Sequence, residues 1–163
     1  YTGGATLAAA AAGATVTHVD ASKGMVTWAK ENAVSSGLKD APIRWLVDDC
    51  VKFVEREIRR GNTYDAIIMD PPSYGRGPKG EIWKIEDMIH PLIRLCAKIL
   101  SEDALFFLVN SYTTGLAPAV LTYMISTELK SWNGHVDSQE IGLPVTNSGL
   151  VLPCGASGRW ESR

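Results

Sequence analysis

The sequence has few cysteines and no long hydrophobic run. Its three cysteines, Cys50, Cys96 and Cys154, are odd in number, widely separated and never at metal-ligand spacing. This usage argues against a disulfide framework or a metal site and favours a reducing compartment. No apolar run approaches the roughly 20 residues that a membrane-spanning helix needs. The sequence therefore predicts a soluble, cytoplasmic protein that holds no metal.

The sequence also lacks an excess of charge of one sign. Its 16 basic and 18 acidic residues give a net charge of −2. The surface as a whole therefore does not attract a polyanion, and any nucleic-acid contact would have to be local. A length of 163 residues with 45% hydrophobic residues is typical of one globular domain that buries about two thirds of its unfolded surface. We therefore expect a single domain over residues 1–163.

Short β-branched runs alternate with longer helical segments, which indicates an α/β fold with ligands at the carboxyl ends of parallel strands. Strands are expected at 15–19, 43–47, 64–69 and 104–110, and helices at 5–12, 22–36, 50–60, 85–100 and 118–129. Two closing runs, 136–143 and 149–153, have no helix between them and predict an antiparallel hairpin. Because the chain starts at Tyr1 directly on a glycine turn, we expect an upstream segment in the natural protein.

The most informative motif is Asp70-Pro71-Pro72-Ser73-Tyr74, which follows the apolar run 66–69. An acid at the mouth of a buried strand, followed by two prolines that fix φ and remove two backbone donors, predicts a rigid turn. Such a turn presents carbonyl oxygens and an aromatic ring to a cleft, which suits a flat substrate that carries an amino group. The alternative is a strand that ends in a Pro-Pro turn without any binding role.

The segment 75–80 that follows is rich in Gly, Pro and basic residues, and it predicts a surface loop. Its Arg76 and Lys79, together with Lys84, either contact phosphate groups or are simply solvated.

A glycine turn and an acidic strand end lie near the start of the chain. Thr2-Gly3-Gly4 precedes a small-residue helix, where the backbone can approach a ligand closely. An ordinary turn is the alternative. Asp20 ends the strand that follows, about 17 residues beyond the glycines, where a carboxylate can accept both hydroxyls of a ribose. Its alternative role is a helix N-cap, although Ser22 is better placed for that.

Asp48 and Asp49 end the next strand. One of these carboxylates can accept a hydrogen bond from the exocyclic amine of adenine, while the Cys50 backbone donates to a ring nitrogen. Acidic residues are also favoured at a helix N-terminus by the macrodipole, and the two roles can coexist.

The glycine turn, the two acidic strand ends and the Asp-Pro-Pro motif follow one another at successive strand ends. With this arrangement the chain resembles the class I S-adenosylmethionine (SAM)-dependent methyltransferases over nearly its whole length. Two further stretches narrow the resemblance: Gly77-Pro78-Lys79-Gly80-Glu81-Ile82-Trp83 after the Asp-Pro-Pro motif, and Leu152-Pro153-Cys154-Gly155-Ala156-Ser157-Gly158-Arg159-Trp160 near the end. With them the chain is similar to bacterial ribosomal RNA methyltransferases related to the large-subunit cytosine methyltransferases.

The resemblance implies a Rossmann-like fold with a mostly parallel seven-stranded sheet, whose first strand would precede Tyr1. It implies SAM as cofactor, RNA as partner and a cofactor site in which the glycines face the methionine moiety, Asp20 binds ribose, Asp49 binds adenine and Asp70 lies beside the methyl group. The implied cofactor-binding residues are Thr2, Gly3, Gly4, Asp20, Ala21, Asp49, Cys50 and Asp70, and the implied catalytic residues are Asp70, Pro71, Pro72 and Tyr74.

The chain departs from the cytosine enzymes at one place. Methylation at carbon five of cytosine needs a cysteine nucleophile, but the segment after the fifth strand reads Val109-Asn110-Ser111-Tyr112-Thr113. The three cysteines lie elsewhere, and such residues are more often small core hydrophobes.

An exocyclic amine needs only positioning: Asp70 and the Pro71 carbonyl accept its hydrogen bonds, and Tyr74 stacks on the base. The sequence therefore predicts a SAM-dependent enzyme that methylates a base in RNA. The alternatives are methylation of an amine on another substrate, a nicotinamide-dependent oxidoreductase, and a non-catalytic binding subunit.

Overall fold

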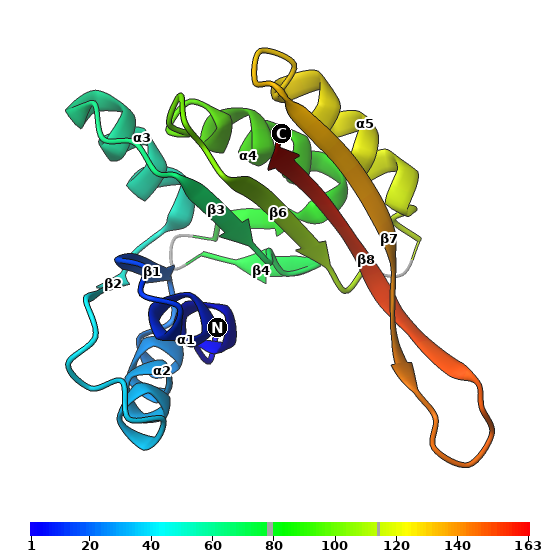
Figure 1. Ribbon diagram of the computed structural model, residues 1–163, viewed down its shortest axis with the longest axis horizontal. Coiled ribbons are helices and arrows are strands. Elements are labelled where there is room, and N and C mark those ends of the chain that lie inside the picture. The colour runs from blue at the N-terminus through cyan, green and yellow to red at the C-terminus, as the bar shows by residue number, and fades with distance from the viewer. Residues whose placement is uncertain (78–79, 114) are drawn as a thin grey trace. The chain divides into compact units, whose positions relative to one another are not determined.

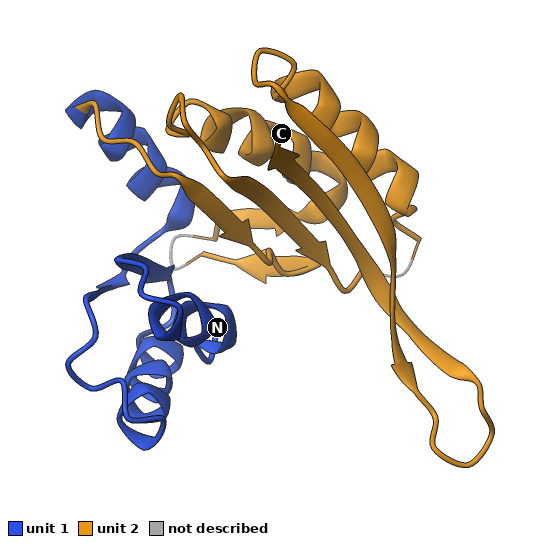
Figure 2. Cartoon of the chain, viewed as in Figure 1, with its two compact units in different colours: residues 1–60 blue, residues 61–163 orange. Residues whose placement is uncertain are grey.

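The computed structural model describes residues 1–77, 80–113 and 115–163. The chain forms two compact units, residues 1–60 and residues 61–163 (Figure 2).

The first unit is built on two parallel strands. Its elements are α1 (Gly4–Ala11), β1 (Val16–Asp20), α2 (Lys23–Ser35), β2 (Ile43–Val47) and α3 (Cys50–Arg60) (Figure 1). β1 and β2 pair in parallel with Asp20 opposite Val47, so both strands end at the same edge. Ser22 is the N-cap of α2 and accepts the Met25 N–H at 3.4 Å, as its residue type favours.

The second unit has a four-stranded sheet and a separate two-stranded ribbon. Its elements are β3 (Ala66–Met69), β4 (Tyr74–Arg76), β5 (Ile82–Lys84), α4 (Ile85–Ala97), β6 (Phe106–Ser111), α5 (Pro118–Glu128), β7 (Gly134–Pro144) and β8 (Val151–Ser162). The sheet has the order β3-β6-β8-β7, in which β3 and β6 are parallel and β8 is antiparallel to both of its neighbours. Helices α4 and α5 lie on one face of this sheet (Figure 1).

The core of the second unit lies between that sheet face and the two helices. Burial alternates along β6, where Phe107, Val109 and Ser111 are buried, as expected for a strand with one face in the core. Leu121 and Ile125 of α5 are fully buried, and their spacing of four residues places them on one face of the helix. Removal of such apolar surface from water is the main contribution to the stability of this unit.

Most of the elements expected from the sequence are present, with boundaries that differ by up to three residues. The described strands form separate sheets, with β1 and β2 as a sheet of their own, so the seven-stranded sheet that the resemblance implies is not confirmed. Two expectations were wrong. The last strand does not end at residue 153 but continues to Ser162, because β6 pairs with it on one side and β7 on the other. Segment 75–80 is not all loop, because Gly75 and Arg76 belong to β4; Pro78 and Lys79 lie outside the described residues.

None of the helices in the described part of the chain is long and apolar enough to cross a membrane.

Gly158 of β8 is packed against α5 and offers a test of this core. A Cβ added there would lie 2.8 Å from both Leu121 Cβ and Ile125 Cδ1. We expect Gly158→Ala to lower the free energy of unfolding by about 1 to 3 kcal/mol through overpacking, measured by urea denaturation. The control is Gly24→Ala in α2, where the nearest atom to the added Cβ is Ser22 Oγ at 3.8 Å, and which should be neutral or slightly stabilising. Equal stabilities of the two variants would contradict this packing.

Candidate functional site

Asp20 lies at the carboxyl end of β1, at the edge where β2 also ends. Its Oδ1 accepts the Ser22 N–H at 2.7 Å. The backbone carbonyl of Asp20 accepts the Asp48 N–H at 3.0 Å, which ties the ends of the two strands together. A carboxylate has about four lone-pair sites, so the cap contact leaves Asp20 with further capacity to accept hydrogen bonds.

The glycine turn leads into α1 beside the same edge. Gly3 is the N-cap of α1 with φ of 94°, a left-handed conformation that favours glycine, and no side chain caps the helix. The Thr2 carbonyl accepts a hydrogen bond from Asn32 Nδ2 at 2.9 Å, which fixes the turn against α2. A Cβ added to Gly4 would meet no atom within 4 Å. The start of α1 thus offers uncapped N–H groups and open space to a ligand.

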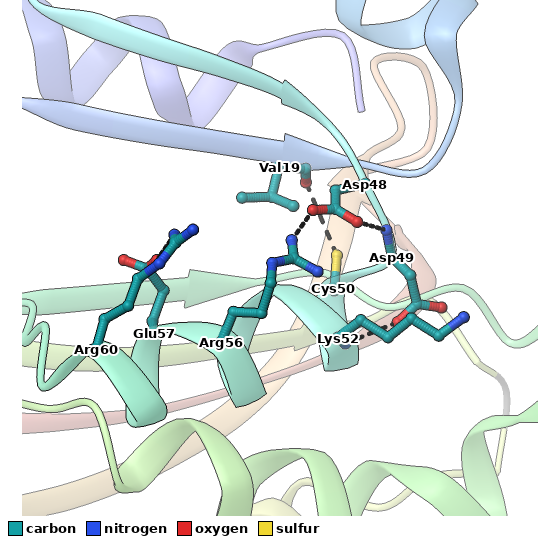
Figure 3. Close-up of polar contacts among 8 residues, drawn as sticks. All are labelled: Val19, Asp48, Asp49, Cys50, Lys52, Arg56, Glu57 and Arg60. Atoms are coloured by element: carbon teal, nitrogen blue, oxygen red, sulfur yellow. Dashed lines mark hydrogen bonds and ion pairs between the residues drawn. The ribbon is translucent and has the colours of Figure 1, made fainter.

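The two acids after β2 have different roles. Asp48 accepts the Asp49 N–H at 2.9 Å and forms an ion pair with Arg56 (Figure 3). Asp49 caps α3, because its Oδ1 accepts the Lys52 N–H at 2.9 Å (Figure 3). Its second oxygen has no hydrogen-bond partner among the described residues. Of the two acids, Asp49 is therefore the one with an oxygen left to accept an adenine amine, and capping and binding are compatible.

Cys50 is the first residue of α3, and its Sγ lies 3.9 Å from the Val19 carbonyl oxygen (Figure 3). Cys50 is an exposed residue, but neighbouring protein atoms partly desolvate its sulfur, which raises the pKa of Cys50, and the carboxylates of Asp20 and Asp49 raise it further. The thiol is therefore protonated at neutral pH, which does not suit a nucleophile.

In the second unit, Asp70 directly follows β3 and opens the Asp-Pro-Pro turn. Partial burial of its carboxyl raises the pKa of Asp70. Trp83 Nε1–H donates to the Pro72 carbonyl at 2.6 Å, and the hydroxyls of Ser73 and Thr113 are 2.6 Å apart. These contacts hold the turn from β5 and from the segment after β6. Among the described residues nothing donates to the Pro71 carbonyl, so it remains an acceptor beside Asp70.

Tyr74, the first residue of β4, is half exposed. Its hydroxyl accepts a hydrogen bond from Arg76 Nε at 2.8 Å. The guanidinium carbon of Arg76 lies 6.0 Å from the centre of the Tyr74 ring, so the ring is half exposed with a cation beside it.

The structure thus gathers the predicted site residues in two groups. Those in the first unit are Thr2, Gly3, Gly4, Asp20, Ala21, Asp49 and Cys50, and those in the second are Asp70, Pro71, Pro72 and Tyr74. Sequence reasoning named Trp83 and Thr113 within longer segments but gave neither a contact with the turn. These contacts come from 11 and 40 residues away, and no local pattern indicates them.

His18 of β1 lies in the same unit. It is buried, with Nδ1 2.8 Å from Thr6 Oγ1 and its ring against Trp45. Burial lowers the pKa of His18, so the ring is neutral at physiological pH. Its Nε2 has no partner among the described residues. Within the described ranges, no three His, Cys, Asp or Glu side chains are grouped as metal ligands would be.

Comparisons with known proteins agree with this geometry. No protein-family model matches the chain. The crystal structure of the SAM-dependent methyltransferase from Agrobacterium tumefaciens is 42% identical, with a TM-score of 0.94, over the whole chain and 54% of that protein. A structure of a candidate methyltransferase complexed with S-adenosylhomocysteine (SAH) is 25% identical, with a TM-score of 0.79, over 98% of this chain and 43% of the other. The chain therefore has the Rossmann-like fold of the class I SAM-dependent methyltransferases, as its sequence predicted.

The resemblance to ribosomal RNA methyltransferases is confirmed as well. The chain is 33% identical over 101 residues to the ribosomal RNA large subunit methyltransferase K/L of Shewanella frigidimarina, a match that covers 58% of this chain and 14% of that protein. The chain thus spans about half of its solved Agrobacterium relative and a small part of this curated one.

The raised pKa of Cys50 can be tested by alkylation. We expect iodoacetamide at about pH 8 to modify Cys50 more slowly than a free cysteine, whose pKa is about 8.5, with modification mapped by mass spectrometry. Asp20→Asn should speed the reaction, because removal of a negative charge lowers the thiol pKa. Asp40→Asn, a change at an exposed loop residue, is the control and should have no effect. Faster modification of Cys50 than of free cysteine would contradict this electrostatic account.

Proposed function

We propose that this chain is the catalytic domain of a cytoplasmic SAM-dependent methyltransferase that modifies a base in ribosomal RNA. The observation that carries the proposal is the grouping of the glycine turn, Asp20 and Asp49 at the shared carboxyl edge of β1 and β2. Similarity to a protein complexed with SAH supports the cofactor. The name of the curated relative supports RNA as the substrate.

The residues of the first unit fit such a cofactor. The left-handed turn at Gly3 and the open space at Gly4 admit the methionine end next to backbone N–H groups. Asp20 and Asp49 each supply carboxylate oxygens to hydrogen-bond donors, one for the ribose hydroxyls and one for the adenine amine. When bound, SAM supplies an electrophilic methyl group on a positively charged sulfur.

In the second unit, the Asp-Pro-Pro turn suits an exocyclic amine as the acceptor. The Asp70 carboxylate and the Pro71 carbonyl accept the two N–H bonds of the amine, which frees the nitrogen lone pair from conjugation with the ring. Tyr74 stacks on the base and fixes its plane. Asp70 then takes the proton that the nitrogen loses after it gains the methyl group. Catalysis in this scheme comes mainly from alignment of the reacting atoms.

Carbon methylation through a cysteine is less well supported. Near the end of β6, Asn110 accepts a hydrogen bond from Ser157 Oγ at 2.8 Å, and no thiol lies among the described residues of segment 109–113. Cys96 is buried in α4, and Cys154 in β8 donates to the Ile141 carbonyl at 3.4 Å. Cys50 has a raised pKa. An amine acceptor therefore fits these residues better than carbon five of cytosine.

The alternatives from the sequence make different predictions for cofactor binding. Calorimetric titration of the chain with SAH and with NAD separates them. We propose that SAH binds and NAD does not. A nicotinamide enzyme would show the reverse, and a non-catalytic subunit with a blocked pocket would bind neither.

The role of Asp20 is tested by Asp20→Ala. We expect the dissociation constant for SAH to increase at least tenfold, since each hydrogen bond to a charged group contributes about 1.5 to 3 kcal/mol. Asp40→Ala is the matched control, because it removes an exposed acid from the same unit without a predicted ligand contact. Circular dichroism checks that both variants are folded. An unchanged SAH affinity in folded Asp20→Ala would refute the ribose assignment.

Asp70 is expected to affect turnover rather than cofactor binding. Asp70→Asn should lower methyl transfer from labelled SAM to large-subunit ribosomal RNA by about 100-fold or more, with SAH affinity nearly unchanged. Because the carboxylate form is the acceptor and the pKa of Asp70 is raised, the wild-type rate should increase as pH rises through that pKa. Asp103→Ala, at an exposed turn, serves as control. Full activity of Asp70→Asn would mean that the motif is only a turn.

A further inference from the structure

The two faces of the β4–β5 ribbon carry different kinds of side chain. The two strands pair antiparallel with Tyr74 opposite Lys84 and Arg76 opposite Ile82. Directly opposed residues of an antiparallel pair point to the same side, and neighbours along a strand point to opposite sides. Tyr74, Arg76, Ile82 and Lys84 therefore share one face, and all four are exposed. Gly75 and Trp83 share the other face and are less exposed.

The face with Gly75 and Trp83 is fixed to the Asp-Pro-Pro turn. Trp83 Nε1–H donates to the Pro72 carbonyl at 2.6 Å, and a Cβ added to Gly75 would lie 3.9 Å from Pro72 Cγ. Beyond the ribbon, the Ile85 N–H donates to the Ser73 carbonyl at 3.1 Å. With one face anchored in this way, the ribbon presents its other face to solvent directly beside the predicted catalytic turn.

Among the described residues, the positive charges on the exposed face have no carboxylate partner. Arg56, Arg94 and Arg159 each pair with a carboxylate, whereas neither Arg76 nor Lys84 forms an ion pair with any other described residue. Arg76 instead uses Nε to donate to the Tyr74 hydroxyl at 2.8 Å, with its guanidinium carbon 6.0 Å from the centre of the Tyr74 ring. Both terminal nitrogens of Arg76 are left to donate to an anion, and the contact holds the charge beside the aromatic ring.

We infer that this exposed face binds the single-stranded RNA that flanks the base to be methylated. Arg76 and Lys84 contact phosphate groups and Ile82 contacts an unstacked flanking base, while Tyr74 stacks on the base to be methylated. The inference rests on the proposed function and deepens it by assigning residues that hold the RNA backbone. An aromatic ring beside uncompensated cations is the usual combination for single-stranded nucleic acid, since each base offers a planar face and each nucleotide a phosphate. A local patch of this kind is compatible with a net charge of −2.

The test is the salt dependence of RNA affinity. The full chain, saturated with SAH, is titrated into a fluorescently labelled single-stranded RNA of about 12 nucleotides at several salt concentrations. Each lost phosphate contact should reduce the slope of log affinity against log salt by about 0.7. We therefore expect the double variant Arg76→Gln, Lys84→Gln to bind more weakly at low salt, with a slope smaller by about 1.4. The charge-matched control Lys98→Gln, Lys130→Gln removes two exposed lysines of the same unit and should keep the wild-type slope.

A second variant examines the aromatic ring. Tyr74→Phe keeps the stacking surface but removes the hydroxyl that holds Arg76, so its RNA affinity should lie between that of wild type and that of Tyr74→Ala. All the residues changed are exposed, and thermal melts with SAH titrations confirm that each variant is folded and binds the cofactor product.

The inference is overturned if the ribbon double variant and the control have the same slope while both still bind SAH. It is also overturned if a polyglutamate peptide displaces the RNA at equal charge concentration, because the face would then bind acidic protein segments. A chain that binds RNA through Arg76 and Lys84 but fails to bind SAH would overturn the proposed methyltransferase function instead.

Discussion

Parallel strand pairing is the constraint on which the candidate site depends. In a parallel pair both strands end at the same edge, so residues that follow one strand lie beside residues that follow the other. β1 and β2 bring Asp20 next to the segment of Asp48 and Asp49. β3 and β6 do the same for the Asp-Pro-Pro turn and Thr113, whose hydroxyl meets that of Ser73. Strand pairing therefore places residues that are distant in the sequence next to one another.

Helices α2 and α3 begin at the edge where β1 and β2 end, so their N-termini act on the carboxylates there. Each helix N-terminus presents N–H groups and a partial positive charge, which favour nearby carboxylates. Asp49 satisfies α3 with one oxygen, and Asp20 accepts the Ser22 N–H at the start of α2. Each acid keeps capacity for a ligand while it stabilises local structure. The same two carboxylates raise the pKa of the Cys50 thiol, so the charge arrangement that suits ribose and adenine also suppresses thiol chemistry there.

The Asp-Pro-Pro turn owes its rigidity to two sources. The prolines restrict the backbone covalently, and hydrogen bonds from Trp83 and Thr113 hold the turn from other elements. The indole engages the Pro72 carbonyl, so the acceptors left beside the acid are its own carboxylate and the Pro71 carbonyl. A turn fixed in this way presents its acceptors before a substrate arrives, which lowers the entropic cost of alignment.

The sequence by itself determined the element types, the cap at Ser22, the strand end at Asp20, the acids that follow β2 and the Asp-Pro-Pro motif, because periodicity, capping and turn chemistry are local. Only the tertiary structure decided which acid after β2 stays available, since the ion pair of Asp48 with Arg56 needs the folded helix. It also decided that β8 runs to Ser162 through a segment rich in glycine, because hydrogen bonds from strands on both sides outweigh weak local propensity. The β4–β5 ribbon escaped prediction because strands of three residues are too short to show a period. Their pairing, and with it the shared face of Arg76 and Lys84, arises only when the chain folds back on itself.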